Sequence, residues 1–361
     1  MTERDLSWWD PYSDQPYKLP AGDKPRTGLA NLWEYMTIAA TCLGLAPFVL
    51  ARYLSLRPQA ASADAKSFVG LSVSPEQRFA SAVHEMVEEL GVEELLVRVP
   101  VWECDGIDRY AHFLESFRGK RFLINVLQSR ESVLDPEGWR ADLRVIFGGL
   151  RGFTPYFQIG NAINRTKWGC AHSGEYLRLL DIAEQVRREF PGVKLVGSSV
   201  IDFEPLITLR TLFNFHTYRL DAVSSLLYVN RRGSPYGRQY RIFDLHRKLK
   251  LIHALVLAGN RNARRLWITE TNWPLLDTKP YTPNSGHPRS TVDELTQARY
   301  LKQYYQIAYQ TGWVERVYWW QLINPGYGLV DHRGGRLRRH PSYYALKDIL
   351  HGELNAPPAV A

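Results

Sequence analysis

Short apolar stretches alternate with longer stretches of helical period from residue 67 to residue 350. Eight of the short stretches are rich in β-branched or aromatic residues and predict strands at 67–73, 94–101, 121–127, 156–161, 194–200, 222–229, 265–271 and 316–322. Between these stretches, apolar residues recur every three or four positions, which predicts amphipathic helices. The clearest helical segments are 75–90, 173–190, 241–257, 291–311 and 341–350.

This eightfold repeat predicts a closed (β/α)8 barrel, a fold of about 250 residues in which helices surround parallel strands. The alternative is an open, doubly wound sheet, whose nucleotide-binding members carry a GxGxxG turn or a GxxxxGK[ST] loop. The turn after the first predicted strand reads LSVSPEQ, and neither motif follows it. The barrel therefore accounts for residues 67–350, and residues 351–361 form a C-terminal tail.

Residues 1–66 differ from the barrel in pattern and predict an N-terminal arm. Residues 1–28 are polar, carry four prolines and lack the basic start and apolar run of a cleaved signal peptide, so we expect irregular structure. The stretch 35–51 holds 17 residues without a charge, the lower limit for a membrane span, and predicts an apolar helix. This helix either contacts a membrane or packs on the barrel, which leaves membrane-associated and cytoplasmic localisation open. Residues 57–66 predict a linker.

Composition narrows the classes of function. The 361 residues are 45% hydrophobic and 23% charged, which is typical of a soluble globular protein and not of a disordered chain or a polytopic membrane protein. The net charge of +8 comes without a zinc-finger, RNP or basic heptad motif, so nucleic acid is not an expected partner. Three widely spaced cysteines predict neither a metal site nor a disulfide, and no motif indicates a cofactor. The 11 Trp and 20 Tyr suit either stacking on sugar rings or a large core.

The active site of such a barrel lies at the carboxyl ends of its strands. The residues at the predicted strand ends are mainly amides and aromatics, namely Arg98, Trp102, Asn161, Asn164, Tyr228, Asn272, Trp273 and Trp320. Glu270 ends an otherwise apolar strand, where burying a carboxylate is costly without a partner or a function. It is either a structural ion-pair partner of Arg98 or a nucleophile that Arg98 and the Tyr228 hydroxyl orient.

Several of these segments together resemble the retaining β-glycosidases of clan A, most closely the branch that holds the β-xylosidases. WITETNWP is similar to the family's seventh-strand segment, which implies that Glu270 is the nucleophile. YFQIGNAIN is similar to the fourth-strand segment, which usually ends Gly-Asn-Glu-Pro-Asn, and this implies that Asn161 binds the sugar 2-hydroxyl and that the acid/base belongs at residue 162. Tyr228 matches the tyrosine that contacts the nucleophile, and Trp320 matches the tryptophan beneath the sugar. The resemblance covers residues 67 to about 350.

Residue 162 is alanine, and a methyl group cannot protonate a leaving group. A retaining glycosidase needs two carboxyl groups about 5–5.5 Å apart, and losing general acid help costs about 10²- to 10⁴-fold in rate. Another carboxylate after a strand end can replace it, with Asp202 and Glu204 preferred over Glu103, Asp105 and Glu131. Otherwise the protein is a transglycosylase or transferase whose donor needs no acid, or a carbohydrate-binding or scaffold protein of polysaccharide assembly. Ile163 in place of the family's usual Pro favours a natural divergent branch over an introduced substitution.

We therefore predict a glycoside hydrolase-like protein that acts on a β-linked oligosaccharide or a surface polysaccharide, with Glu270 as nucleophile and Asp202 or Glu204 as the second carboxylate. The predicted substrate-binding residues are Arg98, Trp102, Asn161, Ala162, Asn164, Tyr228, Asn272, Trp273 and Trp320. The expected partners are a carbohydrate and, through residues 35–51, a membrane surface. The sequence leaves the sugar, the linkage and the oligomeric state open.

Overall fold

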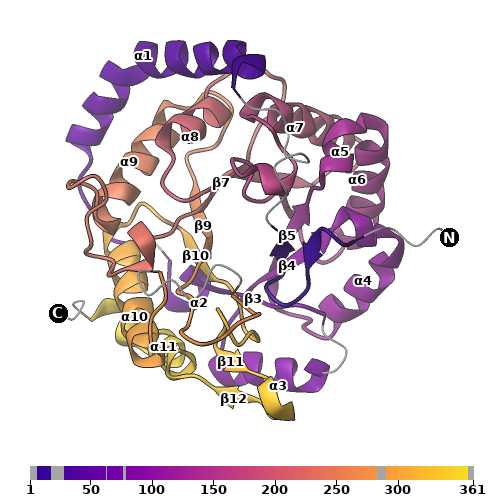
Figure 1. Cartoon of the computed structure of the whole chain (residues 1–361), viewed down its shortest axis with the longest axis vertical. Coiled ribbons are helices and arrows are strands. Elements are labelled where there is room, and N and C mark those ends of the chain that lie inside the picture. The colour runs from indigo at the N-terminus through magenta and orange to yellow at the C-terminus, as the bar shows by residue number, and fades with distance from the viewer. Residues whose placement is uncertain (1–5, 18–27, 62, 76–78, 283–289, 357–361) are drawn as a thin grey trace.

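Eight parallel strands close into a barrel, and Figure 1 shows the helices arranged around it. The computed structural model describes residues 6–17, 28–61, 63–75, 79–282 and 290–356. The strands, in chain order, are β3 (Val69–Ser72), β4 (Glu94–Pro100), β5 (Arg121–Leu127), β6 (Tyr156–Ile159), β7 (Lys194–Ile201), β8 (Ala222–Leu226), β9 (Leu266–Thr271) and β10 (Arg316–Trp319). β10 closes the barrel by pairing with β3, where Val317 lies opposite Val69. The predicted (β/α)8 fold is confirmed.

The predicted helices 173–190 and 341–350 begin where the apolar period places them, whereas those predicted from residues 241 and 291 begin at residues 245 and 294. The helices that follow the arm are α2 (Ala65–Phe68), α3 (Ala80–Leu90), α4 (Ile107–Glu115), α5 (Arg130–Leu134), α6 (Pro136–Leu150), α7 (Ser173–Arg187), α8 (Pro205–Leu212), α9 (Leu245–Ala258), α10 (Glu294–Thr311) and α11 (Pro341–Leu350). α9 starts after Asp244 and α10 after Asp293, because each carboxylate accepts a hydrogen bond from the backbone N–H three residues on and so caps the helix. Residues 76–78 of the predicted helix 75–90 lie outside the described residues.

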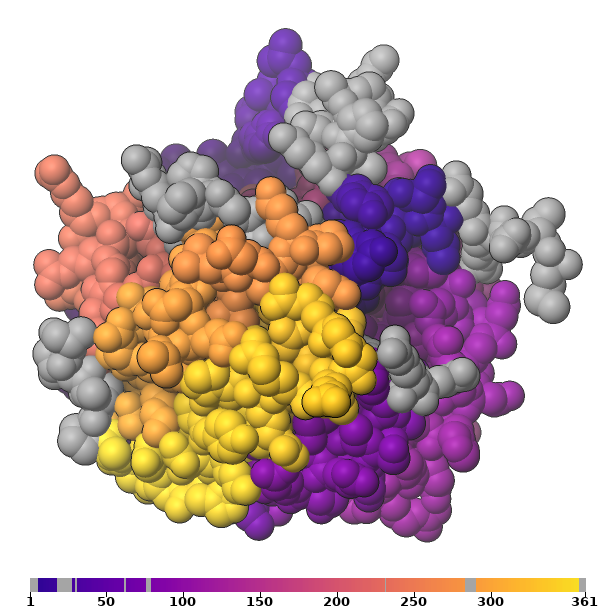
Figure 2. Space-filling view, turned by 60° about the horizontal axis from the view of Figure 1, so that its bottom comes forward, coloured from indigo at the N-terminus to yellow at the C-terminus, as the bar shows by residue number. Residues whose placement is uncertain are grey.

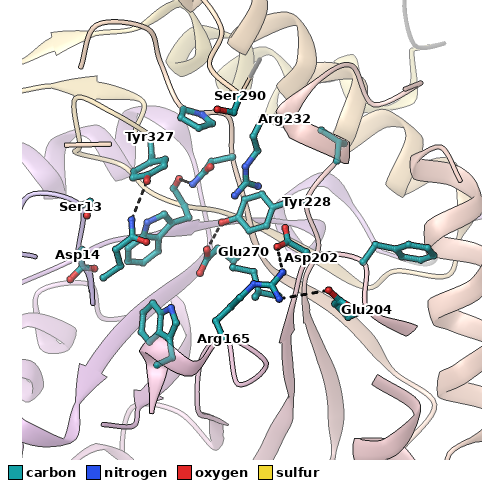
Figure 3. Close-up of a pocket in the computed structure, with 18 of the residues that line it drawn as sticks. Ser13, Asp14, Arg165, Asp202, Glu204, Tyr228, Arg232, Glu270, Ser290 and Tyr327 are labelled. Carbon is teal, nitrogen blue, oxygen red and sulfur yellow. Dashed lines mark hydrogen bonds and ion pairs between the residues drawn. The ribbon is translucent and has the colours of Figure 1, made fainter. Parts of the chain in front are cut away.

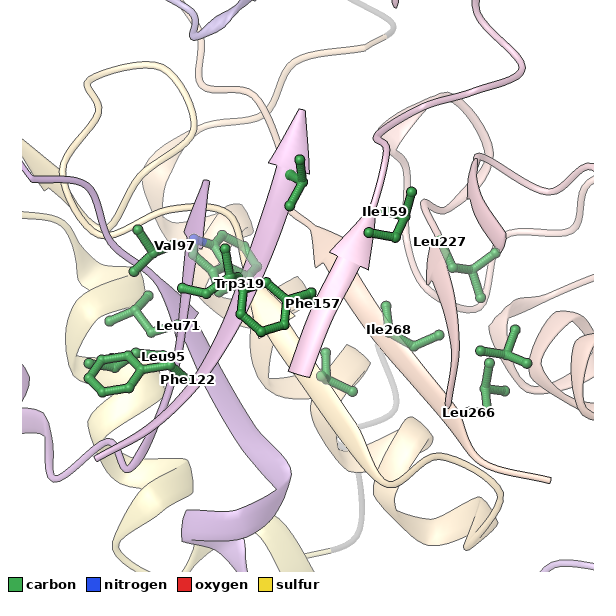
Figure 4. Packing of buried hydrophobic residues seen from close by; sticks show 14 of the residues in the cluster. Leu71, Leu95, Val97, Phe122, Phe157, Ile159, Leu227, Leu266, Ile268 and Trp319 are labelled. Carbon is green, nitrogen blue, oxygen red and sulfur yellow. The ribbon is translucent and has the colours of Figure 1, made fainter. Parts of the chain in front are cut away.

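Alternate residues of each strand face the barrel interior or the helices. One buried cluster fills the interior and consists of Leu96, Leu123, Val196, Ala222, Trp267, Tyr318, Trp320 and Tyr327. Their neighbours Leu95 and Val97 belong to the larger cluster between strands and helices, part of which Figure 4 shows. Because side chains alternate along a strand, Arg98 faces the interior two positions after Leu96, near the carboxyl end of β4.

Residues 6–17 consist mainly of turns, as expected for the arm, and add a short hairpin that the sequence did not predict. β1 (Trp9–Asp10) and β2 (Gln15–Pro16) pair as an antiparallel hairpin. The Asp10 carboxylate holds the turn, since it accepts hydrogen bonds from the Ser13 hydroxyl at 2.6 Å and from the Tyr12 backbone N–H at 3.0 Å. The prolines did not prevent pairing, because a two-stranded edge leaves one side of each strand free of hydrogen bonds.

The hairpin docks against the rim of the barrel at the carboxyl ends of the strands. The Asn324 side chain donates to the Tyr12 carbonyl at 3.0 Å, and the Trp9 ring packs edge-on against Trp102 and Trp168. Figure 2 shows the hairpin as an indigo patch that meets orange and yellow segments of the last third of the chain. The arm therefore forms part of the barrel mouth.

The apolar helix of the arm extends beyond the predicted residues 35–51. α1 (Leu32–Ser55) contains Pro47 and packs along α8 and α9, as Figure 1 also shows. Its Glu34 forms a buried, two-pronged ion pair with Arg210 of α8, with N···O distances of 3.0 and 3.1 Å. By length and apolar composition, α1 is one helix of the described residues that meets the criteria for a membrane span, and only 11% of its most apolar window is buried.

Candidate active site

A cavity of about 520 Å³ opens at the carboxyl ends of the barrel strands, a volume in the range of small-molecule sites. Of the predicted site residues, Arg98, Asp202, Glu204, Tyr228, Glu270, Asn272 and Trp320 line it. The N-terminal hairpin adds Ser13, Asp14 and Gln15, and the loop after β6 adds Arg165, Lys167 and Trp168. Four basic side chains and four carboxylates line this one cavity, so its charges are nearly balanced.

An irregularity in β9 sets the direction of Glu270. Trp267 belongs to the interior cluster, and strict alternation from it would place residues 269 and 271 inside the barrel and residue 270 outside. The pairing of β9 with β10 shifts, however: Ile268 pairs with Val317, but Thr271 pairs with Trp319. Between these two pairs β9 therefore contains one residue more than β10. Such an extra residue changes the direction of the side chains that follow it. Glu270 consequently lines the cavity.

Glu270 is held by two donors that come from different strands. Arg98 Nη2 donates to Glu270 Oε2 at 2.6 Å, and the Tyr228 hydroxyl donates to Oε1. The Arg98 guanidinium also lies 3.2 Å from the centre of the Trp320 ring. Burial raises the pKa of the Tyr228 hydroxyl, and the neighbouring Glu270 charge adds to the increase, so Tyr228 stays a donor. Figure 3 shows Tyr228 and Glu270 pointing toward each other.

The two acids that the sequence favours as replacements form a separate ionic group. Arg165 Nη2 lies 2.6 Å from Asp202 Oδ2, and Arg165 Nη1 lies 3.6 Å from Glu204 Oε1. Both carboxylates are close to half exposed in the cavity wall, and Figure 3 shows them together with Arg165. They are thus within the cavity as the sequence predicts, and they share one cation.

Asp14 is the one carboxylate among the four that line the cavity which was not predicted from the sequence. Arg98 Nη1 donates to the Asp14 carbonyl at 2.9 Å and lies 3.3 Å from Asp14 Oδ2, so one guanidinium contacts both Asp14 and Glu270. No strand-end rule points to residue 14, because it lies more than 50 residues before the first barrel strand. A signal in the sequence is the aromatic pair Trp8 and Trp9 within an otherwise polar segment, and both side chains are half-buried in the structure.

Lys167 joins the hairpin to the loop after β6. Its ammonium group donates to Gln15 Oε1 at 2.6 Å and to the Pro16 carbonyl at 3.2 Å. Burial lowers the pKa of Lys167 to about 8, against the opposing effect of the Glu270 charge. This basic group therefore lies close to the proposed nucleophile although the sequence analysis did not select it.

Ala162 does not line the cavity, contrary to its prediction as a substrate-binding residue. It is completely buried, with a left-handed backbone (φ 47°), in an apolar cluster with Leu127, Trp168, Leu226 and Tyr228. Asn161 is also buried, and its Oδ1 accepts a hydrogen bond from Asn125 Nδ2 at 3.0 Å. Among the described residues, no partner is found for Asn161 Nδ2.

Three other predicted contacts are structural in this fold and lie outside the residues that line the cavity. Trp102 packs edge-on against the hairpin residues Trp8 and Trp9. Trp273 is fully buried and stacks on Trp319. Asn164 ties two loops together, since its side chain exchanges hydrogen bonds with the backbone of Ile201 at 2.9 and 3.0 Å.

Metal chemistry has no ready ligand set in the part of the chain that the structure describes. There, no group of three or more His, Cys, Asp and Glu side chains is arranged to hold a metal ion.

Solved structures of several glycoside hydrolases are similar to this closed barrel in fold. A family 39 glycoside hydrolase from Bacteroides cellulosilyticus WH2 matches with a TM-score of 0.61 at 15% identity, over 82% of this chain and 66% of that chain. A β-glucosidase from Thermotoga maritima, in complex with deoxynojirimycin, matches with a TM-score of 0.55 at 13% identity, over 79% of this chain and 98% of that one.

A GH30 endoxylanase from Clostridium papyrosolvens C71 matches with a TM-score of 0.52 at 10% identity, over 84% of this chain and 75% of that chain. No protein-family model and no curated protein matches the sequence. At these identities the similarity establishes a glycoside hydrolase-like fold and does not establish an activity, because one fold can have many functions.

Proposed function

We propose that this protein is a retaining glycosidase-type enzyme that attacks a β-linked oligosaccharide or surface polysaccharide with Glu270. The observation that carries the proposal is the arrangement of Glu270, which ends a barrel strand, opens to a cavity and is held on both oxygens by Arg98 and Tyr228. Two donors fix the carboxylate in one orientation and compensate its charge in a site that is only 7% exposed. If the ion pair between Arg98 and Glu270 had only a structural role, it would not need a cavity beside it.

Carbohydrate recognition follows from the other groups in the wall. Trp320 contributes an aromatic ring to the wall, and the Arg98 guanidinium lies 3.2 Å from the centre of this ring and holds it in place. Such a ring suits stacking on the apolar face of a sugar. Asn272 Nδ2 donates to the Trp320 carbonyl at 3.0 Å and holds this segment in place. The Asp202–Arg165–Glu204 group supplies both donors and acceptors for hydroxyl groups.

Glycosyl transfer through Glu270 also needs a proton donor for the leaving group. Residue 162 does not supply one, because its methyl group is enclosed. The carboxylates left in the cavity are Asp202 and Glu204, which the sequence favours, and Asp14, which the structure adds. A protein without any working donor would bind carbohydrate without turnover, and this second reading is favoured only by the residue at position 162.

Trapping the covalent intermediate tests the role of Glu270. A 2-deoxy-2-fluoro glucoside or xyloside with a dinitrophenolate leaving group forms a glycosyl ester without help from a general acid. We expect the intact protein to gain the mass of one sugar and digestion to place it on Glu270, with Glu270→Gln as the unlabelled control. If neither reagent labels Glu270 while glucan or xylan oligosaccharides still bind, the protein is a binding module.

We further propose that α1 attaches the protein to a membrane surface. Trp33, Met36, Leu43, Leu50 and Leu54 share its outward face, and Leu43 is 76% exposed. The opposite face packs on the barrel, so α1 is apolar on both sides, whereas a surface helix usually turns a polar face to water. The Glu34–Arg210 ion pair fixes α1 on the barrel, which favours a helix lying in the lipid interface over one that crosses it.

Vesicle sedimentation tests this attachment. The intact chain should sediment with phosphatidylcholine vesicles that contain phosphatidylserine, and the double variant Leu43→Gln and Leu50→Gln should remain in the supernatant. Leu295→Gln is a matched control, because Leu295 is 73% exposed on α10, a helix remote from α1 in sequence. An intact chain that stays in the supernatant contradicts the proposal.

A further inference from the structure

The N-terminal hairpin brings a carboxyl group to the barrel mouth that no barrel strand supplies. Asp14 lies at the end of the hairpin turn, lines the same cavity as Glu270, and has a side chain that is 33% exposed. We propose that Asp14 is the general acid and base of the reaction, in place of the carboxylate missing at residue 162. This inference rests on the proposed function of Glu270 as nucleophile.

Arg98 determines where the Asp14 carboxyl lies relative to the nucleophile. One terminal nitrogen of its guanidinium binds Glu270 at 2.6 Å, and the other lies 3.3 Å from the Asp14 carboxylate. The two carboxyl groups are therefore neighbours across a single planar group. A pair of carboxyl groups flanking one bond is the arrangement that glycoside hydrolysis requires.

Asp14 is the longer and weaker partner of Arg98. The shortest contact of Nη1 is with the Asp14 carbonyl, at 2.9 Å, so the loop backbone and not the carboxylate anchors this end of the guanidinium. The carboxyl group can thus exchange a proton without releasing the hairpin from Arg98.

The hairpin is held firmly enough to position a catalytic group. Next to Asp14, Gln15 accepts a hydrogen bond from Lys167 at 2.6 Å and donates one to the Tyr327 hydroxyl at 3.1 Å. Residue 14 itself has a positive φ of 50°, a conformation that Asp tolerates better than most residues. These contacts anchor the turn to the loops after β6 and β10.

The surroundings of Asp14 suit a group that must start the reaction protonated. Burial at the barrel mouth raises the pKa of its carboxyl group, the charges of Glu103 and Glu270 add to the increase, and Arg98 opposes it. A raised pKa is the usual property of the acid in a pair of catalytic carboxyl groups.

Asp202 and Glu204 are less suitable, although the sequence favours them. Asp202 lies 2.6 Å from Arg165, a shorter contact than that of Asp14 with Arg98, whereas Glu204 lies 3.6 Å from Arg165 and is distinguished from Asp14 by its position. Figure 3 shows Asp202 and Glu204 on one side of Glu270 and Asp14 on the other. On that side their carboxylates are available to accept hydrogen bonds from sugar hydroxyl groups.

The proposed reaction has two steps, glycosylation of Glu270 and hydrolysis of the glycosyl ester. In the first, a Glu270 oxygen bonds to the anomeric carbon, the bond from that carbon to the leaving oxygen breaks, and the Asp14 carboxyl proton moves to the leaving oxygen. In the second, the Asp14 carboxylate takes a proton from water while the water oxygen bonds to the anomeric carbon. The bond from that carbon to the Glu270 oxygen breaks as the bond to the water oxygen forms, which restores both carboxyl groups and retains the configuration of the sugar.

The test compares Asp14→Asn with Asp202→Asn and Glu204→Gln in the full chain, on dinitrophenyl and phenyl β-glucosides and β-xylosides. Asp14→Asn should lower kcat/KM on the phenyl glycosides by about 10²- to 10⁴-fold, because phenolate is a poor leaving group, and much less on the dinitrophenyl glycosides. Azide should speed its turnover of the dinitrophenyl substrate and yield a glycosyl azide of retained configuration. Asp202→Asn and Glu204→Gln should show neither the leaving-group dependence nor the azide product.

The possible outcomes distinguish the role of Asp14 from the role of Glu270. If Glu270 is labelled by the fluoroglycoside but Asp202→Asn or Glu204→Gln shows the azide effect in place of Asp14→Asn, the role of Asp14 is wrong and Glu270 remains the nucleophile. If Asp14→Asn lowers kcat/KM equally on the phenyl and the dinitrophenyl glycosides and azide does not restore turnover, Asp14 only positions Arg98, and the inference is overturned. If Glu270 is never labelled in the intact protein, the proposed function itself fails.

Discussion

Replacing Ala162 by glutamate tests whether residue 162, where the resemblance to known glycosidases places the acid, can hold a working acid in this fold. Its methyl group is fully buried in an apolar cluster with Leu127, Trp168, Leu226 and Tyr228. A glutamate there takes a carboxylate into this apolar cluster, and a buried carboxylate without a compensating partner costs about 3–5 kcal/mol. Overpacking of a closed apolar site adds about 1–3 kcal/mol. We expect Ala162→Glu to lower the free energy of unfolding by at least about 3 kcal/mol and to give no gain of activity on phenyl glycosides.

Urea unfolding followed by tryptophan fluorescence measures the stability change, at pH 7 and at pH 5. The penalty should shrink at pH 5, because protonation removes the buried charge. Ala162→Gly is the matched control: the φ of 47° at this position suits glycine, so we expect a change within about 1 kcal/mol. Ala162→Glu with the stability of the original chain and faster turnover of phenyl glycosides would refute the reasoning, since the side chain would then reach the cavity.

Three further predictions concern the residues around Glu270. Tyr228→Phe removes a hydrogen bond to a carboxylate, worth about 1.5–3 kcal/mol, and should lower kcat on dinitrophenyl glycosides about 10- to 100-fold; an unchanged kcat contradicts the contact. Trp320→Ala should abolish oligosaccharide binding in calorimetry, because it removes the aromatic surface of the cavity and the support of Arg98, and an unaltered Kd would show that sugar binds elsewhere. Burial lowers the pKa of Lys167 from 10.5 to about 8, so the unfolded chain binds more protons than the folded chain between these values and this group makes stability rise with pH there. Lys167→Met should reduce that rise when the free energy of unfolding is measured in urea from pH 8 to 10. Part of the rise should remain, because burial also lowers the pKa of Lys248 to about 8. Equal slopes in the original chain and in Lys167→Met would show that folding does not lower the pKa of Lys167.

The sequence by itself determined the barrel and indicated several of the residues that line its mouth. Strand and helix periods differ, and eight repetitions of the pair leave few alternative folds, so the order of elements followed from local pattern alone. Arg98, Tyr228, Glu270 and Trp320 were identified for the same reason, because each lies where a strand ends, and strand ends meet at one face of a barrel.

Tertiary structure decided the details that depend on contacts between distant segments. The extra residue in β9 turns Glu270 inward, and it appears only in the pairing with β10. Trp273 and Trp102 look like cavity residues from their positions, but the loops that carry them fold into the helix layer and against the hairpin.

The hairpin is the clearest case of a feature that sequence pattern does not contain. Its strands are two residues each, too short for any periodicity, and Asp14 reaches Arg98 only because the arm crosses the barrel mouth. A two-stranded hairpin is marginally stable alone, so its structure comes from docking on the rim through Trp9 and Lys167. Long-range packing, and not local preference, therefore placed the carboxyl group beside Glu270.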